Sequence, residues 1–193
     1  MTHHDRETAG TRTKKIKDGE IPEEWEKPEN KSKLAQKDID ADWTKKNGER
    51  HFGYKDHVKC DADSKLITNY SVTSASVHDS QRCLVFIGQE DEVLYADSAY
   101  SGKPIALALP DSCENQICEK GYRNSPLTSE QKMNNRRKSR IRCRIEHIFG
   151  FMTGAMHGIT IRSIGITRAW MNIGITNLVY NFCRYSYLKR ASA

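Results

Sequence analysis

The sequence lacks three features, and each absence excludes a class of protein. No apolar run approaches the ~18 residues that cross a membrane, so a membrane protein is not expected. The six cysteines include no C-x-x-C pair, and the start Met1-Thr-His-His-Asp-Arg has no apolar segment of a secretory signal. We therefore expect reduced thiols and a cytoplasmic location. A zinc site on Cys113 and Cys118 is the disfavoured alternative, because their spacing is not that of common zinc ligands.

Large apolar residues are scarce near the N-terminus. Only seven occur in the first fifty residues, whereas the chain beyond Phe52 carries most of the Ile, Val, Leu, Tyr and Phe. Pro22 and Pro28 would also interrupt a helix in the early segment. This pattern predicts a polar, charged and mostly extended arm over residues 1–49, followed by a folded domain over residues 50–193.

Acidic residues are missing from one segment that is rich in basic ones. Seven of the thirteen residues from Lys132 to Arg144 are Lys or Arg, and none is Asp or Glu. The whole chain has 31 Lys and Arg against 25 Asp and Glu, with a pI near 9.0. The local charge favours a polyanionic partner. A solvated helix face is the duller explanation of the same run.

Alternating apolar residues predict a β-hairpin at the start of the folded part. After a turn signal at Asn47-Gly48, apolar residues alternate from Phe52 to Cys60, which is the pattern of a strand. Turn residues over 61–65 separate it from a returning strand over 66–73. Next we expect a helix over 81–87, a short apolar strand that ends at Asp97, and a possible strand over 116–119.

Two helices are predicted to complete the fold. The first is long and starts within 125–130, and it buries one stripe of apolar residues spaced by a helical repeat, namely Ile141, Ile145, Ile148 and Met152. Glu146 lies at the border of that stripe, about 100° from Ile145 around the helix, so it can face a cleft. The last helix, over 166–187, is apolar on most sides and reads as a core helix.

Asp97 and Glu146 are the candidate catalytic residues. A carboxylate after a buried strand and another on a helix can hold divalent metal ions against a phosphate backbone, because such ions prefer oxygen ligands. Each also has a simpler explanation, since Asp97 can cap the following turn and Glu146 can pair with Arg142. His78 and His147 do not complete a hydrolase triad, because no serine stands in a strained elbow.

Five motifs then resemble a known family. They are Trp43-Thr-Lys-Lys-Asn-Gly, Phe52-Gly-Tyr-Lys-Asp-His-Val-Lys, Ala75-Ser-Val-His-Asp-Ser, Tyr95-Ala-Asp-Ser-Ala-Tyr-Ser-Gly and Arg142-Cys-Arg-Ile-Glu-His-Ile-Phe-Gly-Phe-Met. In this order they are similar to the C-terminal part of bacterial insertion-sequence DDE transposases of the insertion-sequence-five group. The resemblance runs from about Thr11 to Arg190.

The resemblance implies a fold, a chemistry and a site. The fold is α/β, an RNase H-like mixed sheet with flanking helices. The chemistry is Mg²⁺-dependent (or Mn²⁺-dependent) cleavage at transposon ends and strand transfer into target DNA. Asp97 matches the second acid of the family, Glu146 the third, and Arg142 the arginine four positions earlier. A tyrosine and a lysine of the wider signature are replaced here by Ser139 and Thr153.

The family's first acid has no counterpart in this sequence. Asp5 follows polar residues, and Asp38, Asp40 and Asp42 lie in the polar arm, where the family also tends to carry acidic residues without that role. We therefore expect a chain truncated before its first central strand. The expected partners are DNA, a second copy of the chain or an upstream transposase fragment, in a nucleoid-associated setting without a membrane. The candidate DNA-binding residues are basic, namely Lys45, Lys46, Arg136, Arg137, Arg140, Arg142 and Arg144.

Two alternatives stay open. The chain can be a non-catalytic transposase remnant that binds DNA or needs a complementing fragment. An RNase H-like nuclease of another family is less favoured, because all five motifs agree on the transposases.

Overall fold

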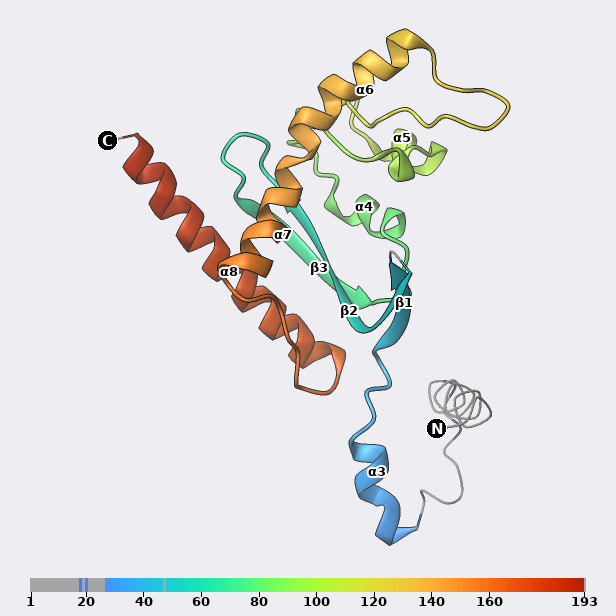
Figure 1. Ribbon diagram of the computed structural model, residues 1–193, viewed down its shortest axis with the longest axis vertical. Helices are drawn as coiled ribbons and strands as arrows, with labels where there is room; N and C mark the ends of the chain where they lie inside the picture. The colour runs from blue at the N-terminus through green and yellow to red at the C-terminus, as the bar shows by residue number, and fades with distance from the viewer. Residues whose placement is uncertain (1–17, 19, 21–26, 47, 193) are drawn as a thin grey trace. The chain divides into compact units, whose positions relative to one another are not determined.

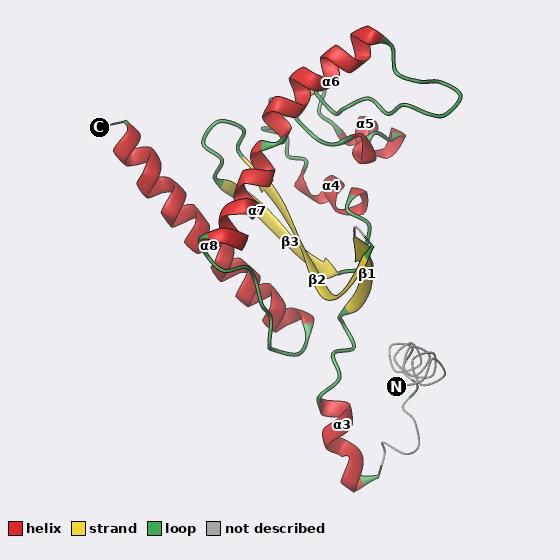
Figure 2. Cartoon of the chain, in the orientation of Figure 1, coloured by secondary structure: helices red, strands yellow, loops and turns green. Residues whose placement is uncertain are grey.

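The computed structural model describes residues 18, 20, 27–46 and 48–192 (Figure 1). Most of the predicted arm over 1–49, including Asp5, therefore lies outside the described residues, as does Asn47 of the predicted turn. The described chain is a mixed α/β structure, as predicted. Figure 2 shows its helices and strands. Among the described helices, none is both long enough and apolar enough to cross a membrane.

The secondary structure alternates short strands with helices. The strands are β1 (Asp42–Lys46), β2 (Glu49–Cys60), β3 (Ile67–Ser74), β4 (Val93–Leu94) and β5 (Glu114–Asn115). The α-helices are α3 (Lys31–Ala35), α4 (Ser80–Phe86), α5 (Lys103–Ala108), α6 (Ser129–Arg142), α7 (Arg144–Gly154) and α8 (Ile166–Ala191). Short 3-10 helices are η1 (Pro28–Asn30) and η2 (Ser98–Tyr100). Within the described residues the strands form two small sheets, with orders β1-β2-β3 and β4-β5.

The chain divides into two compact units. The first holds the chain up to Lys55 together with 72–76 and 161–172, and the second holds 56–71, 77–160 and 173–193. The predicted hairpin of β2 and β3 is confirmed, and both strands pass through both units. Strand β2 starts earlier than expected because Glu49 to Gly53 pair with β1.

The first unit consists of the β1–β2 hairpin and segments that hydrogen bonds to two aspartates hold together. Gly48 in the turn has φ +87°, a backbone conformation that glycine adopts without strain. Asp38 accepts bonds from Tyr54 Oη at 2.6 Å and from the Gly165 amide at 3.2 Å. Asp40 accepts from the amide of Ile166, the first residue of α8, at 2.9 Å. These two acids of the arm therefore have structural partners.

The second unit has two apolar clusters. The larger one buries Ile67, Ile148, Met152 and Tyr180, with Ile145 packed against them. It confirms the predicted stripe for Ile145, Ile148 and Met152 on the helix that carries Glu146, whereas Ile141 lies on α6 outside this cluster. The other cluster consists of Cys83, Ile105 and Ile117, packed against Leu94, Ala96 and Tyr100. It holds α4 and α5 against the β4–β5 pair, so the segment before Asp97 is anchored in a core.

The predicted long helix is wrong in one respect, because it breaks at Cys143. Helix α6 starts at Ser129, within the predicted range 125–130, where Thr128 and Gln131 form a capping box, and it ends at Arg142. The Cys143 backbone, at ψ −8°, departs from helical values, and α7 begins at Arg144. Both Arg142 and Glu146 thus lie beside a helix junction.

Candidate functional site

Asp97 stands at the end of a parallel strand pair. Beyond the two residues of β4, the pairing continues through bonds from Gln116 N to Leu94 O at 2.9 Å and from Cys118 N to Ala96 O at 3.0 Å. The strand predicted at 116–119 is therefore displaced, with β5 at 114–115 and the pairing reaching Cys118. The exposed Asp97 carboxylate then caps η2, because its Oδ1 accepts from Ser98 N at 2.5 Å.

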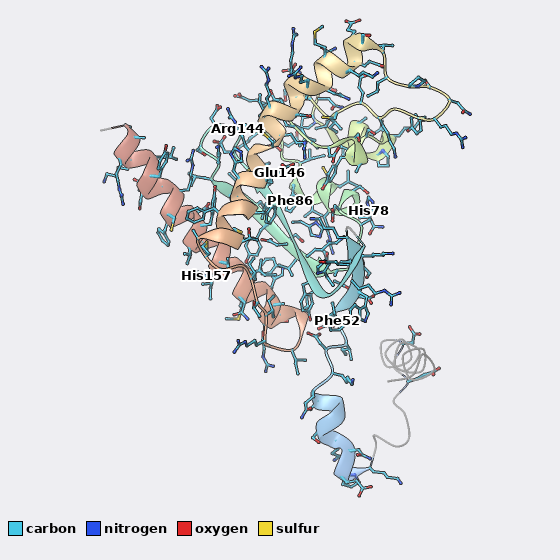
Figure 3. The ribbon with its side chains drawn as sticks, viewed as in Figure 1. Phe52, His78, Phe86, Arg144, Glu146 and His157 are labelled. Carbon is cyan, nitrogen blue, oxygen red and sulfur yellow. The ribbon has the colours of Figure 1, made fainter. Side chains whose placement is uncertain are left out.

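Glu146 lies in the first turn of α7, where the helix dipole favours a negative charge. Figure 3 labels it together with Arg144 of the same helix. Arg142 Nη2 donates to Glu146 Oε1 at 2.9 Å, and the glutamate side chain is 61% exposed. The pairing that the sequence allowed is therefore present, and it leaves the carboxylate open to solvent.

Helix α6, which precedes Glu146, contacts residues 114–119, here called the β5 segment, which pairs with the strand before Asp97. Asn135 on α6 forms two bonds with the Glu119 backbone, donating to its oxygen at 2.9 Å and accepting from its amide at 2.8 Å. Lys138 Nζ donates to Ile117 O at 3.0 Å. The β5 segment in turn pairs with the strand that ends at Asp97. The two acids therefore lie in one unit, on elements that α6 and the β5 segment link.

Ser139 and Thr153 occupy the positions at which this sequence departs from the wider signature. Ser139 Oγ lies 3.8 Å from Cys118 Sγ, at the contact between α6 and the β5 segment. Thr153 Oγ1 donates back to Phe149 O at 2.9 Å, within its own helix. Both hydroxyls have local partners, and neither replaces the missing tyrosine or lysine chemically.

A group of residues around Asp97 was not predicted from the sequence. Burial, followed by the charges of Asp79, Cys83 and Asp97, raises the pKa of Tyr100 to about 12. The buried His57 lies with Nδ1 3.7 Å from Asp79 Oδ1. The sequence pointed to His78 beside Asp79, but His78 Nδ1 contacts Ser80 Oγ at 2.8 Å. The only sequence signal for Tyr100 is its place three residues after Asp97 in the fourth motif.

A hollow of about 250 Å³ opens beside the loop that follows Asp97. Its lining residues come from the η2–α5 turn and the β5 segment, namely Ser101, Gly102, Lys103, Ala106, Asn115, Ile117, Cys118 and Glu119. Cys118 bonds to Ala96, the residue before Asp97, so the hollow borders the end of that strand. No three Asp, Glu, His or Cys side chains come together as a metal-binding group within the described ranges.

The candidate DNA-binding arginines differ in exposure and in the contacts that they make within the fold. Arg136, Arg137 and Arg140 are exposed on α6. Arg142 is half-buried and paired with Glu146. Arg144, also half-buried, donates to Ala62 O and to Asp63 Oδ1 in the turn after β2. Arg144, a candidate for DNA binding, is therefore engaged in a contact within the fold.

Lys45 and Lys46 lie on β1 in the first unit, and both are exposed. Strand β1 itself was not expected as a separate element, because its sequence Asp-Trp-Thr-Lys-Lys has no apolar alternation. Pairing with β2 makes it a strand.

Comparison with known proteins gives a consistent answer. A family model described as "Transposase DDE domain" matches residues 11–182. A curated relative, the "Transposase for insertion sequence element IS1106" of Neisseria meningitidis serogroup B, is 32% identical over 117 residues. Those residues are 59% of this chain and 40% of the relative, so the chain matches less than half of the relative's length. No solved structure matches the chain.

Proposed function

The chain belongs to the family of transposase DDE domains, and we propose that it acts in DNA transposition by cutting and rejoining DNA phosphodiesters at Asp97 and Glu146. The observation that carries the proposal is the contact of α6 with the β5 segment. Asn135 and Lys138 of α6, the helix that ends just before the junction with Glu146, bond to the neighbour of the strand that ends at Asp97, which supports a site shared by the two acids. Both acids are also exposed, as residues that meet a DNA backbone must be.

The carboxylates fit a divalent cation by their chemistry. Within the described part of the chain, Asp97 uses Oδ1 to cap η2 and Glu146 uses Oε1 to accept from Arg142, so one oxygen of each remains available. Mg²⁺ and Mn²⁺ prefer such oxygen ligands and usually keep several waters. Asp97 and Glu146 would hold the ion, which when bound stabilises charge on the phosphodiester oxygens.

The other residues of the site orient the Glu146 carboxylate and attract the DNA backbone. Arg142 holds the Glu146 carboxylate in place across the helix junction. The exposed guanidinium groups of Arg136, Arg137 and Arg140 attract the phosphate backbone, and Arg142, Arg144, Lys45 and Lys46 add to the positive charge. No motif that reads base edges is evident, so we propose binding led by the backbone charge.

An RNase H-like sheet is the fold that we propose around this site. Within the described residues, β4 pairs only with β5, and β2 pairs with β1 only as far as Gly53. Lys59 Nζ on β2 lies 2.6 Å from Asp91, which precedes β4. His57, two residues earlier on β2, contacts Asp79. The charge of Asp79 raises the pKa of Tyr100, which follows β4. These contacts support an antiparallel course of β2 and β4 in the second unit. A further strand between them would join the two small sheets into one mixed sheet.

A plasmid-nicking assay tests the proposal. Purified protein with Mg²⁺ or Mn²⁺ is expected to convert supercoiled plasmid to open circles, and Asp97→Asn or Glu146→Gln is expected to abolish this conversion. Asp111→Asn and Glu90→Gln are matched controls, because both side chains are exposed and lie outside the site. Absence of nicking with either metal would rule out autonomous cleavage.

The second candidate is DNA binding without cleavage by this chain alone. It is favoured by the lack of a three-residue metal-binding group within the described ranges. In that case a second polypeptide would supply the further carboxylate and the strand between β2 and β4. A gel-shift assay with a salt titration tests the binding. The double variant Arg136→Glu/Arg140→Glu should bind duplex DNA far more weakly, and unchanged binding would reject α6 as the contact.

A further inference from the structure

The β1–β2 hairpin carries an unusual set of four side chains on one face. Trp43 lies directly opposite Phe52, and Lys45 lies directly opposite Arg50. Residues two apart in a strand point to the same side of the sheet, about 7 Å from one another. Trp43, Lys45, Arg50 and Phe52 therefore share one face, here called the hairpin face.

The two cations of the hairpin face oppose each other. Like charges directly across an antiparallel pair destabilise it, and both Lys45 and Arg50 are exposed. The opposite face of the hairpin has the usual arrangement, because Lys46 pairs with Glu49. The strand pairing thus balances charge on one face and concentrates positive charge on the other, where an anion would relieve the repulsion.

The two aromatic rings are left uncovered beside those cations. Trp43 is 57% exposed and Phe52 is 47% exposed. Their ring centroids are 5.2 Å apart with an interplanar angle of 53°. They contact each other, yet much of both rings remains open to solvent. Rigid rings next to cations are the combination that holds stacked bases and their phosphates.

We propose that the hairpin face binds an unpaired nucleic-acid strand. A base stacks on Trp43 and Phe52, and the adjoining phosphate lies between Lys45 and Arg50. The assignment rests on the proposed function in that both concern DNA, but it needs neither Asp97 nor Glu146. It adds three residues, Trp43, Arg50 and Phe52, to the contacts discussed above and gives Lys45 a specific role.

Charge and shape favour this occupant over two others. An acidic peptide would neutralise the cations and leave the rings without flat partners. An anionic membrane binds a larger apolar surface than two rings on a hairpin provide. A nucleic-acid strand matches both features, because every base has a face that can stack and every nucleotide carries one phosphate.

Fluorescence anisotropy with a labelled single-stranded oligonucleotide tests the proposal. Trp43→Ala and Phe52→Ala should each weaken binding about ten-fold, and Trp43→Phe should restore most of the loss. Lys45→Ala and Arg50→Ala should each lower the salt slope by about 0.7. Tyr122→Ala and Lys31→Ala remove an exposed ring and an exposed cation elsewhere, and serve as matched controls.

The variant Lys45→Glu separates binding from folding. It turns the like-charged pair with Arg50 into an opposite-charged pair, so the melting temperature should rise slightly while strand binding falls. Unchanged strand binding in Trp43→Ala and Phe52→Ala would overturn the proposal. Equally tight binding of polyglutamate or anionic vesicles through the same residues would also overturn it. Strand binding is measured on the unaltered chain without a divalent metal ion, so failure of the nicking assay and failure of this proposal give different results.

Discussion

Arg142 donates to Glu146 across the junction between α6 and α7. The pair is four residues apart, as in a continuous helix, although the backbone departs from helical geometry at Cys143 between them. Because the glutamate side chain is 61% exposed, the pair contributes little to folding. We propose that the pair instead orients the Glu146 carboxylate for its role in DNA cleavage.

Replacing Arg142 should therefore affect nicking more than stability. We expect Arg142→Ala to lower the nicking rate about ten-fold, because the Glu146 carboxylate loses its orientation, with less than about 1 kcal/mol of lost stability. Nicking rates and urea unfolding curves measured on the same preparations test this. The nicking rate of Arg142→Lys should lie between those of the unaltered protein and Arg142→Ala, because lysine keeps the charge without the guanidinium geometry. A large loss of stability with normal nicking would make Arg142 a purely structural residue.

The contact of α6 with the β5 segment gives a second prediction. Asn135→Ala removes both bonds to the Glu119 backbone, which should cost about 1–3 kcal/mol of stability and also slow nicking. Asn134→Ala is the matched control, because it removes the neighbouring amide on the same helix. Unfolding by urea and nicking at equal folded fraction separate the two effects. If nicking is normal once folding is corrected for, α6 does not position Glu146 for Asp97.

A buried acid–amide pair predicts how stability depends on pH. Asn177 Nδ2 donates to Asp56 Oδ1 at 3.3 Å, whereas Asp56 Oδ2 and Asn177 Oδ1 are buried without partners. A single proton on Asp56 would satisfy both oxygens. Burial raises the pKa of Asp56 from 3.8 to about 6, with the Asn177 bond opposing the change.

The sign of the effect follows from that raised pKa. The folded state binds the Asp56 proton more tightly than the unfolded state, so this stabilisation is complete below pH 3.8 and is lost as pH rises to about 6. The loss is on the order of 3 kcal/mol. Asp56→Asn keeps an amide donor at all pH values, and should be more stable than the parent at pH 7.5. Urea unfolding at pH 5 and pH 7.5 tests this, and equal stabilities at pH 7.5 would contradict it.

Much of the local structure could be predicted from the sequence. Periodicity indicated the β2–β3 hairpin, the strand before Asp97 and the buried stripe of Ile145, Ile148 and Met152, because apolar spacing directly reflects which face is covered. The break at Cys143 could not be predicted, since neither glycine nor proline marks it. Strand β1 was missed because Trp43 and its neighbours are exposed, and its pairing with β2 has no apolar pattern.

The surroundings of the site depend on long-range contacts. The motifs indicated Asp97 and Glu146 as candidate catalytic residues, and that assignment stays a prediction. The contact of His57 with Asp79 joins residues that no local pattern connects. Arg144 was expected to face phosphates, yet it bonds to the turn after β2, because that turn presents the Ala62 carbonyl and the Asp63 carboxylate. Charge alone does not reveal which arginines are occupied within the fold.

Iron-directed cleavage of the polypeptide tests whether Asp97 and Glu146 hold one metal ion together. Fe²⁺ in place of Mg²⁺, with peroxide and ascorbate, generates radicals that cut the backbone beside the bound ion. A metal ion held by both acids should direct cuts near Asp97 and near Glu146, and both sets of cuts should be lost in Asp97→Asn as well as in Glu146→Gln. Cuts at only one of these segments, or cuts at both that persist in either variant, would contradict a shared metal site.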